Sequence, residues 1–360
     1  MRSEQVTVIG DGGWGTALAL LLLGKGRAVR LWGAFPDYIE AMRHGRENVK
    51  FLPGVPLPAA LELTSDLAAA VAGADLLVMA VPTPFLRGVL RRLARCWWHG
   101  HLARDPQAGS LCHREGRQAG RSSPRCGIPI VSVAKGIENR TLLRPTQIIA
   151  GVLGRAPVAA LSGPSHAEEV ARGLPATVTI ASHSEALACL AQDAFMTDRF
   201  RVYTTSDVAG VELGGAVKNV VAIAAGICDG LGLGDNAKAA LLTRGLAEIT
   251  RLGVALGARR GTFAGLAGIG DLITTCMSPY GRNRSVGIQI GQGKKLDAIL
   301  AGMDMVAEGV RTALSVRALA RRHRVEMPIT EQVYQVLFRG KDPKAAARDL
   351  MRRTVRDEAS

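Results

Sequence analysis

The sequence has few aromatic residues, few cysteines and fewer acidic than basic side chains. Aromatic residues make up 4% of its 360 residues and hydrophobic residues 48%, a globular composition that excludes disorder over most of the chain. The six cysteines are scattered with no CxxC pair, which excludes a disulfide scaffold and indicates a reducing compartment. At about 100–200 residues per domain, the length predicts two domains.

A secretory signal and a membrane span are also missing. The N-terminal residues lead directly into an apolar strand and a glycine loop, with no cleavable apolar region between them. The longest apolar run, residues 17–23, is far shorter than the roughly 20 residues that a bilayer span requires. We therefore expect a cytoplasmic protein without stable membrane insertion.

The 45 basic residues outnumber the 31 acidic ones, and the net charge of +14 is unevenly distributed. Residues 91–125 hold eight arginines and two acids, and residues 311–360 hold twelve basic residues and six acids, so each region carries +6. A basic excess attracts nucleic acid, anionic membranes or anionic substrates. Because most of it lies away from the candidate site residues identified below, the charge is weak evidence for nucleic acid.

Short apolar runs alternate with helical patterns in the first half of the chain. This alternation predicts an α/β fold with a parallel, doubly wound sheet of βαβ units. The predicted strands are residues 6–10, 28–32, 74–81, 128–134, 158–162 and 177–181. From about residue 206 the pattern is helical, with Ser206 and Asp207 as candidate caps. We therefore predict a Rossmann-type domain over residues 1–205 and an all-α domain over residues 206–360.

One segment of the first half has neither strand nor helix periodicity. Residues from about 96 to 127 are rich in Arg, Gly, Ser and Pro, and we expect them to form an inserted loop. The cysteines and histidines of this segment are Cys96, His99, His101, Cys112, His113 and Cys126. Their irregular spacing differs from the short paired spacing of structural zinc sites, so we predict no metal site.

A glycine loop follows the first predicted strand. Residues 10–15 (GDGGWG) match GxGxxG in a strand–loop–helix context, which indicates a dinucleotide-binding loop. Gly10 allows the tight turn, Gly12 lets a diphosphate approach the backbone, and Gly15 lets helix and strand pack closely. The helix that follows offers its free N–H groups and its dipole to the diphosphate.

The end of the second strand would normally indicate which nucleotide is bound. Residues 32–34 (WGA) carry neither the acid typical of NAD binding nor an arginine suited to the 2′-phosphate of NADP, unless Arg30 reaches it. The sequence therefore leaves the choice between NAD and NADP open.

Two lysines are candidates for acid–base chemistry. Lys135 follows a buried strand, at the edge where doubly wound sheets bind ligands, although a surface lysine would give the same pattern. Lys218 lies on a predicted helix face of small residues that includes Gly214 and Gly215. Burial lowers the pKa of a lysine toward the range useful for proton transfer. We predict that Lys218 is buried or lines a cleft; the alternative is a stem that packs on this face while the ammonium reaches solvent.

Asp271 and the segment after it indicate a second cluster of polar groups. Asp271 begins a helical pattern, either as a helix cap or as a carboxylate that orients a lysine. Arg282 and Asn283 follow a turn at a loop–helix junction, where forked guanidinium donors and an amide suit a phosphate. Solvated loop charge is the alternative for the arginine.

Together these motifs resemble one family, the bacterial NAD(P)-dependent glycerol-3-phosphate dehydrogenases, in order along nearly the whole chain. The similar segments are residues 10–17, 51–54, 80–82, 131–138, 161–170, 212–222, 268–276, 281–284 and 308–309. The resemblance implies reversible reduction of dihydroxyacetone phosphate to sn-glycerol 3-phosphate with NADH or NADPH. It also implies a role in supplying phospholipid synthesis.

The resemblance implies roles for individual residues. Lys218 corresponds to the proton donor and acceptor, Lys135 to a second lysine near cofactor and substrate, and Asp271 to the carboxylate that pairs with them. The implied substrate contacts are Lys135, Gly163, Ser165, Lys218, Asp271, Gly281, Arg282 and Asn283. The implied cofactor contacts are Gly10, Gly12, Gly13, Trp14, Gly15, Lys135, Ala167, Arg282, Val306 and Glu308.

The chain departs from the family pattern at four positions. Gly13 and Gly281 stand where serine is usual, and the second change removes one hydroxyl from the expected phosphate site. Ala34 replaces an arginine, which weakens the usual handle for an NADP 2′-phosphate, and His166 replaces a phenylalanine. None of these changes affects the two lysines or Asp271.

Two other functions fit part of the pattern. A 3-hydroxy-acid dehydrogenase shares the lysine-bearing helix, but Arg282 and Asn283 favour a phosphate substrate. A basic Rossmann-scaffold protein that binds nucleic acid or a membrane surface fits the charge, but no nucleic-acid-binding motif is recognisable. We therefore expect no nucleic-acid partner. The sequence does not decide the oligomeric state, for which a homodimer is one option.

Overall fold

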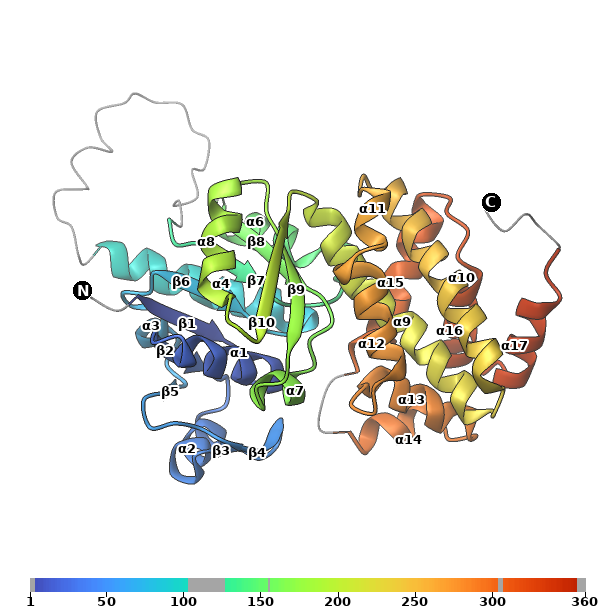
Figure 1. The fold of residues 1–360 in the computed structure, drawn as a ribbon, viewed down its shortest axis with the longest axis horizontal. Coiled ribbons are helices and arrows are strands. Elements are labelled where there is room, and N and C mark those ends of the chain that lie inside the picture. Colours follow the sequence, from blue (N-terminus) through green and yellow to red (C-terminus); the bar gives the residue numbers. More distant parts are fainter. Residues whose placement is uncertain (1–3, 103–126, 155, 304–306, 355–360) are drawn as a thin grey trace.

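The computed structural model describes residues 4–102, 127–154, 156–303 and 307–354, in which an α/β half is followed by a helical half (Figure 1). The largest sheet in these ranges has eight strands in the order β10-β9-β8-β7-β6-β1-β2-β5. Its strands are β1 (Gln5–Ile9), β2 (Ala28–Trp32), β5 (Glu62–Thr64), β6 (Leu76–Met79), β7 (Ile130–Ser132), β8 (Val158–Ser162), β9 (Ala176–Ala181) and β10 (Phe200–Thr205). The strand order reverses between β1 and β6, where doubly wound sheets bind ligands.

All six predicted strands are confirmed, and the sheet is mainly parallel as predicted, with one antiparallel pairing. β9 pairs antiparallel with β8, with Ala160 opposite Ala181, and β10 pairs parallel with β9. The connection from β8 to β9 carries only the short helix α7 (Ala167–Ala171), which packs against α1 (Gly13–Gly24). The chain therefore returns along the sheet instead of crossing its face. Sequence patterns missed β5, β10 and the separate hairpin of β3 (Glu47–Asn48) and β4 (Leu52–Pro56).

The remaining helices of the α/β half are α2 (Pro36–Gly45), α3 (Leu67–Val71), α4 (Thr83–Leu102), α6 (Pro145–Leu153) and α8 (Glu185–Phe195). Helix α4 corrects the predicted start of the inserted loop, because residues 96–102 continue this helix. Leu86, Leu90 and Leu93 are buried along one face of α4 at helical spacing, and this face anchors the helix on the sheet. The rest of the predicted insertion, residues 103–126, lies outside the described residues.

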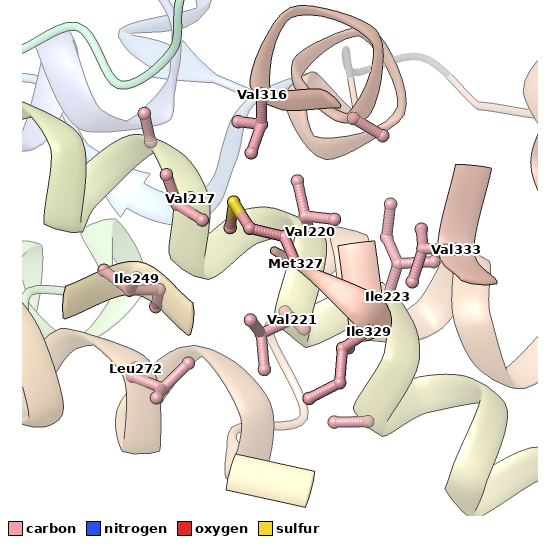
Figure 2. Packing of buried hydrophobic residues seen from close by; sticks show 14 of the residues in the cluster. Val217, Val220, Val221, Ile223, Ile249, Leu272, Val316, Met327, Ile329 and Val333 are labelled. Atoms are coloured by element: carbon pink, nitrogen blue, oxygen red, sulfur yellow. The ribbon is translucent and has the colours of Figure 1, made fainter. Parts of the chain in front are cut away.

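The helical half is built around α9 (Val208–Gly230), which is buried along nearly its whole length. The other elements of this half are α10 (Gly234–Ala255), α11 (Arg260–Phe263), η1 (Leu266–Gly270), α12 (Asp271–Met277), α13 (Arg282–Gly291), α14 (Leu296–Ala301), α15 (Glu308–Arg322), α16 (Pro328–Arg339) and α17 (Pro343–Met351). Figure 2 shows Val217, Val220 and Val221 of α9 among side chains from neighbouring helices, including Ile249 and Leu272. Burial of this apolar surface stabilises the position of α9, and with it the position of Lys218.

Two details of α9 bear on the sequence predictions. The Asp207 side chain accepts a hydrogen bond from the Gly210 amide over 2.9 Å, which confirms Asp207 as the cap. Among the described residues, α9 is the one helix long and apolar enough to cross a membrane, yet its most apolar stretch is wholly buried in the protein. Its apolar character is therefore that of a core helix.

Candidate active site

Lys218, Lys135 and Asp271 meet where the two halves of the chain join. Lys218 lies in the middle of α9, Lys135 follows β7, and Asp271 is the first residue of α12. The Lys135 Nζ atom is 2.9 Å from Asp271 Oδ2, and the Lys218 ammonium donates to Asp271 Oδ1. Of the two readings of Asp271, the structure favours the orienting carboxylate, because Gly270 and not Asp271 occupies the N-cap position of α12.

This lysine centre is shielded from water. Lys218 is 5% exposed and Asp271 1% exposed, which confirms the predicted burial of Lys218. Burial lowers the pKa of Lys218 to about 7; Asp271 opposes this shift and Lys135 adds to it. Burial alone would raise the pKa of Asp271, but the two ammonium groups outweigh it and hold that pKa below its usual value. Asp271 therefore stays ionised while Lys218 gains or loses a proton near neutral pH.

Two hydroxyl groups that the sequence reasoning did not single out complete the centre. Lys218 Nζ donates to Thr275 Oγ1 over 2.6 Å, and Ser162 Oγ donates to Asp271 Oδ2 over 3.2 Å. Thr275 lies one helical turn after Asp271, so the spacing of four residues was the signal for a shared face. Ser162 ends β8, and a Cβ atom on Gly215 would lie 2.6 Å from its hydroxyl. Glycine at 215 thus lets α9 approach the end of the strand.

The glycine loop has the geometry of a nucleotide-binding turn. Gly10 has a φ of +121°, and a Cβ atom on Gly15 would lie 1.9 Å from the Gly10 carbonyl oxygen. Both positions therefore require glycine. A Cβ atom on Gly12 would meet nothing within 4 Å, so the backbone there borders open space at the N-terminus of α1. Open space beside this helix terminus fits the diphosphate of a dinucleotide.

Gly13, Trp14 and Ala167 lie together on the inner side of this loop. A Cβ atom on Gly13 would lie 2.5 Å from the Phe51 carbonyl oxygen and 3.6 Å from Ala167 Cβ. The serine usual at position 13 would therefore require the backbone to shift. The Trp14 ring lies 6.4 Å from that of Phe200, and its indole N–H is buried without a hydrogen-bond partner in the part of the chain that the structure describes. Trp14 thus packs inward beneath the loop.

The predicted phosphate-binding residues lie at the start of α13. Asn283 is buried and its Oδ1 accepts a hydrogen bond from the Gly309 amide over 3.0 Å, which holds the amide group in a single orientation. Arg282 is exposed and is close enough to Glu308 to influence its titration. A Cβ atom on Gly281 would lie 2.8 Å from the Thr275 carbonyl oxygen, so the usual serine does not fit this backbone.

Gly163, Ser165 and His166 form a loop beside the lysine centre. The Gly163 carbonyl accepts hydrogen bonds from Lys135 Nζ over 3.3 Å and from Ser165 Oγ over 3.1 Å. The His166 ring lies within 3.4 Å of the Thr274 carbonyl on α12, so the loop contacts the helical half directly. Burial lowers the pKa of His166, which keeps this ring neutral at pH 7.

Glu308 lines a cleft between the two halves of the chain. Its carboxylate accepts a hydrogen bond from the Thr83 amide over 3.2 Å, and burial raises its pKa against the opposing effect of Arg282. The cleft has a volume of about 530 Å³, and among its lining residues are Thr83, Gly136, Glu308 and Thr312. Val306, the other predicted cofactor contact here, lies outside the described residues.

The part of the chain that the structure describes contains no candidate metal site. No group of three or more His, Cys, Asp or Glu side chains in residues 4–102, 127–154, 156–303 and 307–354 could hold a metal ion. Of the histidines and cysteines of the predicted loop, Cys96, His99 and His101 belong to α4, whereas Cys112, His113 and Cys126 fall in residues 103–126, outside these ranges.

Comparison with known proteins assigns the chain to a family. The model of the NAD-dependent glycerol-3-phosphate dehydrogenase N-terminus matches residues 5–104 and 114–188, and that of the C-terminus matches residues 207–348. The chain belongs to the NAD-dependent glycerol-3-phosphate dehydrogenase family. The N-terminal model leaves residues 105–113 unmatched, which lies within the predicted insertion.

Individual members of the family are similar over almost the full chain. The glycerol-3-phosphate dehydrogenase [NAD(P)+] 2 of Salinibacter ruber is 48% identical, covering 99% of this chain and 96% of the relative. The glycerol-3-phosphate dehydrogenase [NAD(P)+] of Geobacillus kaustophilus is 49% identical with the same coverage. The crystal structure of the Coxiella burnetii glycerol-3-phosphate dehydrogenase is 36% identical and superposes with a TM-score of 0.86 over 98% of this chain and 99% of that one.

Proposed function

We propose that this chain catalyses the reversible NAD(P)H-dependent reduction of dihydroxyacetone phosphate to sn-glycerol 3-phosphate. The observation that carries the proposal is the buried Lys218–Asp271–Lys135 centre, in a chain that also has the glycine loop of a nucleotide-binding turn. When bound, the reduced nicotinamide supplies the hydride that adds to the carbonyl carbon of the substrate. The residues of this chain bind and orient both molecules and move the proton.

Lys218 is the proposed proton donor. As a ketone is reduced, its oxygen becomes an alkoxide, and a buried ammonium beside that oxygen both stabilises the charge and delivers the proton. The pKa of about 7 lets Lys218 take the proton back when glycerol phosphate is oxidised. Asp271 holds the ammonium groups of Lys218 and Lys135 in place, and the second ammonium adds positive charge beside the oxygen.

Substrate anchoring is assigned to the start of α13 and to the loop of Gly163 and Ser165. Arg282 supplies charge-assisted donors for the phosphate and Asn283 an amide. The cofactor residues are assigned to the glycine loop, Ala167 and the region of Val306 and Glu308. Binding a remote phosphate fixes the reacting carbon near Lys218, and this lowers the entropic part of the barrier.

The proposal extends to the organisation and setting of the protein. We assign nucleotide binding to residues 1–205 and substrate binding with proton transfer to residues 206–360. A cytoplasmic enzyme that supplies glycerol phosphate for phospholipid synthesis is the proposed cellular role. We assign no nucleic-acid partner and no membrane insertion, and light scattering of the purified protein tests whether it forms a homodimer.

The test is oxidation of NADH and of NADPH by the purified protein with dihydroxyacetone phosphate, followed by absorbance. We expect turnover by the unmodified chain and by Lys294→Ala, which removes an exposed lysine just after the end of α13. Lys218→Ala should lose nearly all turnover while still binding nucleotide. The absence of turnover with both cofactors in the unmodified chain, or full activity in Lys218→Ala, would contradict the proposal. A 3-hydroxy acid with NAD(P)+ serves as the comparison substrate.

A further inference from the structure

Asp11, the second residue of the glycine loop, places a carboxylate beside the end of β2. Its Oδ2 atom lies 2.5 Å from the point that a Cβ atom on Gly33 would occupy. The same oxygen is buried and has no hydrogen-bond partner among the described residues, and burial raises the pKa of the carboxyl. The Asp11 carboxylate therefore lies at the carboxyl end of β2, where β2 itself carries no acid.

The basic side chain on β2 does not balance this charge. Arg30 donates to Glu62 over 2.7 Å and to the Ala72 carbonyl over 2.8 Å, so its guanidinium is held away from the carboxyl end of the strand. This contradicts the option that Arg30 reaches a nucleotide 2′-phosphate. Ala34 is exposed and uncharged, and α2 begins with Pro36, which has no backbone N–H to offer an anion.

We propose that Asp11 makes this enzyme select NAD(H) over NADP(H). In doubly wound folds the adenosine ribose lies at the carboxyl end of the second strand, beside Gly33 in this chain. Asp11 as a whole is only partly buried, so a ribose 2′-hydroxyl there donates a hydrogen bond to its other carboxylate oxygen, Oδ1, whereas a 2′-phosphate brings further negative charge against the carboxylate. This inference rests on the proposed binding of a dinucleotide at the glycine loop, but not on the identity of the substrate.

Calorimetric titration of the full chain with ADP-ribose and with 2′-phospho-ADP-ribose tests the inference. Neither probe carries a nicotinamide, so the measurement is independent of turnover. We expect the unmodified protein to bind ADP-ribose at least about tenfold more tightly, since like charges at close range cost at least about 1.4 kcal/mol. Asp11→Asn, which keeps the side-chain shape, should reduce that ratio about fivefold or more by the same argument. Ala34→Arg, at an exposed position, should reduce the ratio by raising the affinity for the phosphorylated probe.

The matched control is Asp75→Asn. This exposed carboxylate accepts a hydrogen bond from the Gln5 amide at the amino end of the sheet, so the substitution removes the same charge far from the glycine loop. The control should keep the ratio of the unmodified protein. Equal affinities in the unmodified protein, a preference for the phosphorylated probe, binding of neither probe, or an Asp11→Asn ratio matching Asp75→Asn would each overturn the inference. Selective binding of ADP-ribose without turnover of dihydroxyacetone phosphate would overturn only the proposed function.

Discussion

Lys218 should lower the stability of the protein, and Lys218→Met measures that cost. The pKa of Lys218 is about 7 in the fold against 10.5 for an ordinary lysine, so its ammonium costs about 5 kcal/mol at pH 7. Methionine fills a similar volume without charge. The stabilisation gained by removing the buried charge is reduced by about 1–3 kcal/mol, because Asp271 and Thr275 each lose a hydrogen-bond partner. We expect a net stabilisation of about 2–4 kcal/mol at pH 7.

The pH dependence gives the sharper test. Because the folded protein binds this proton less tightly than the unfolded chain does, the full cost is present below pH 7 and disappears as the pH rises toward 10.5. Urea unfolding at several pH values should therefore show the original protein gaining about 1.4 kcal/mol per pH unit relative to Lys218→Met. Lys294→Met, at an exposed site, should follow the original protein throughout. A constant difference between Lys218→Met and the original protein from pH 7 to 10 would refute the reasoning.

Three further substitutions test other parts of the structure. Gly15→Ala places a Cβ atom 1.9 Å from the Gly10 carbonyl oxygen and should abolish nucleotide binding in a calorimetric titration; retained affinity would contradict the loop geometry. Asn283→Ala should raise the KM for dihydroxyacetone phosphate about 10- to 100-fold, the loss expected for a hydrogen bond to a charged group, with the KM for NADH unchanged. The pKa of Glu248, a residue of α10 buried against the first amides of α16, is raised to about 7, so the original protein should lose stability relative to Glu248→Gln as the pH rises from 4.5 to 7. If the difference in free energy of unfolding between the original protein and Glu248→Gln stays constant over that range, Glu248 is not the titrating group.

Much of the fold could be predicted because the strands of the sheet core are continuous apolar runs. The predicted limits of 28–32 and 158–162 agree with β2 and β8. The strand β10 was missed because its residues alternate between buried and exposed and include charged and polar side chains, as expected at a sheet edge. The end of α4 was missed because the residues around position 96 have the composition of a loop. The helix continues there although its buried residues, Leu90 and Leu93, lie one and two turns earlier.

The candidate site could be predicted in part. Lys218 was found because a lysine among small residues on one helix face is unusual, and its burial follows from that pattern. Asp11 was not singled out, because its position beside Gly33 depends on how the loop folds back over β2. Ser162 was missed for the same reason, since its hydroxyl has a partner only because Asp271, at the start of α12, comes within hydrogen-bond distance of the end of β8. Spacing in sequence carries no information about such pairs.

The pH dependence of the reaction in its two directions tests the central claim most directly. If Lys218 is the proton donor, kcat/KM for reduction of dihydroxyacetone phosphate should fall as the pH rises through about 7, because the ammonium is lost. For oxidation of sn-glycerol 3-phosphate it should rise through the same range, because the neutral amine is then the base. Both limbs should be absent from the residual activity of Lys218→Ala. Profiles that move in the same direction, or limbs that persist in Lys218→Ala, would contradict the account.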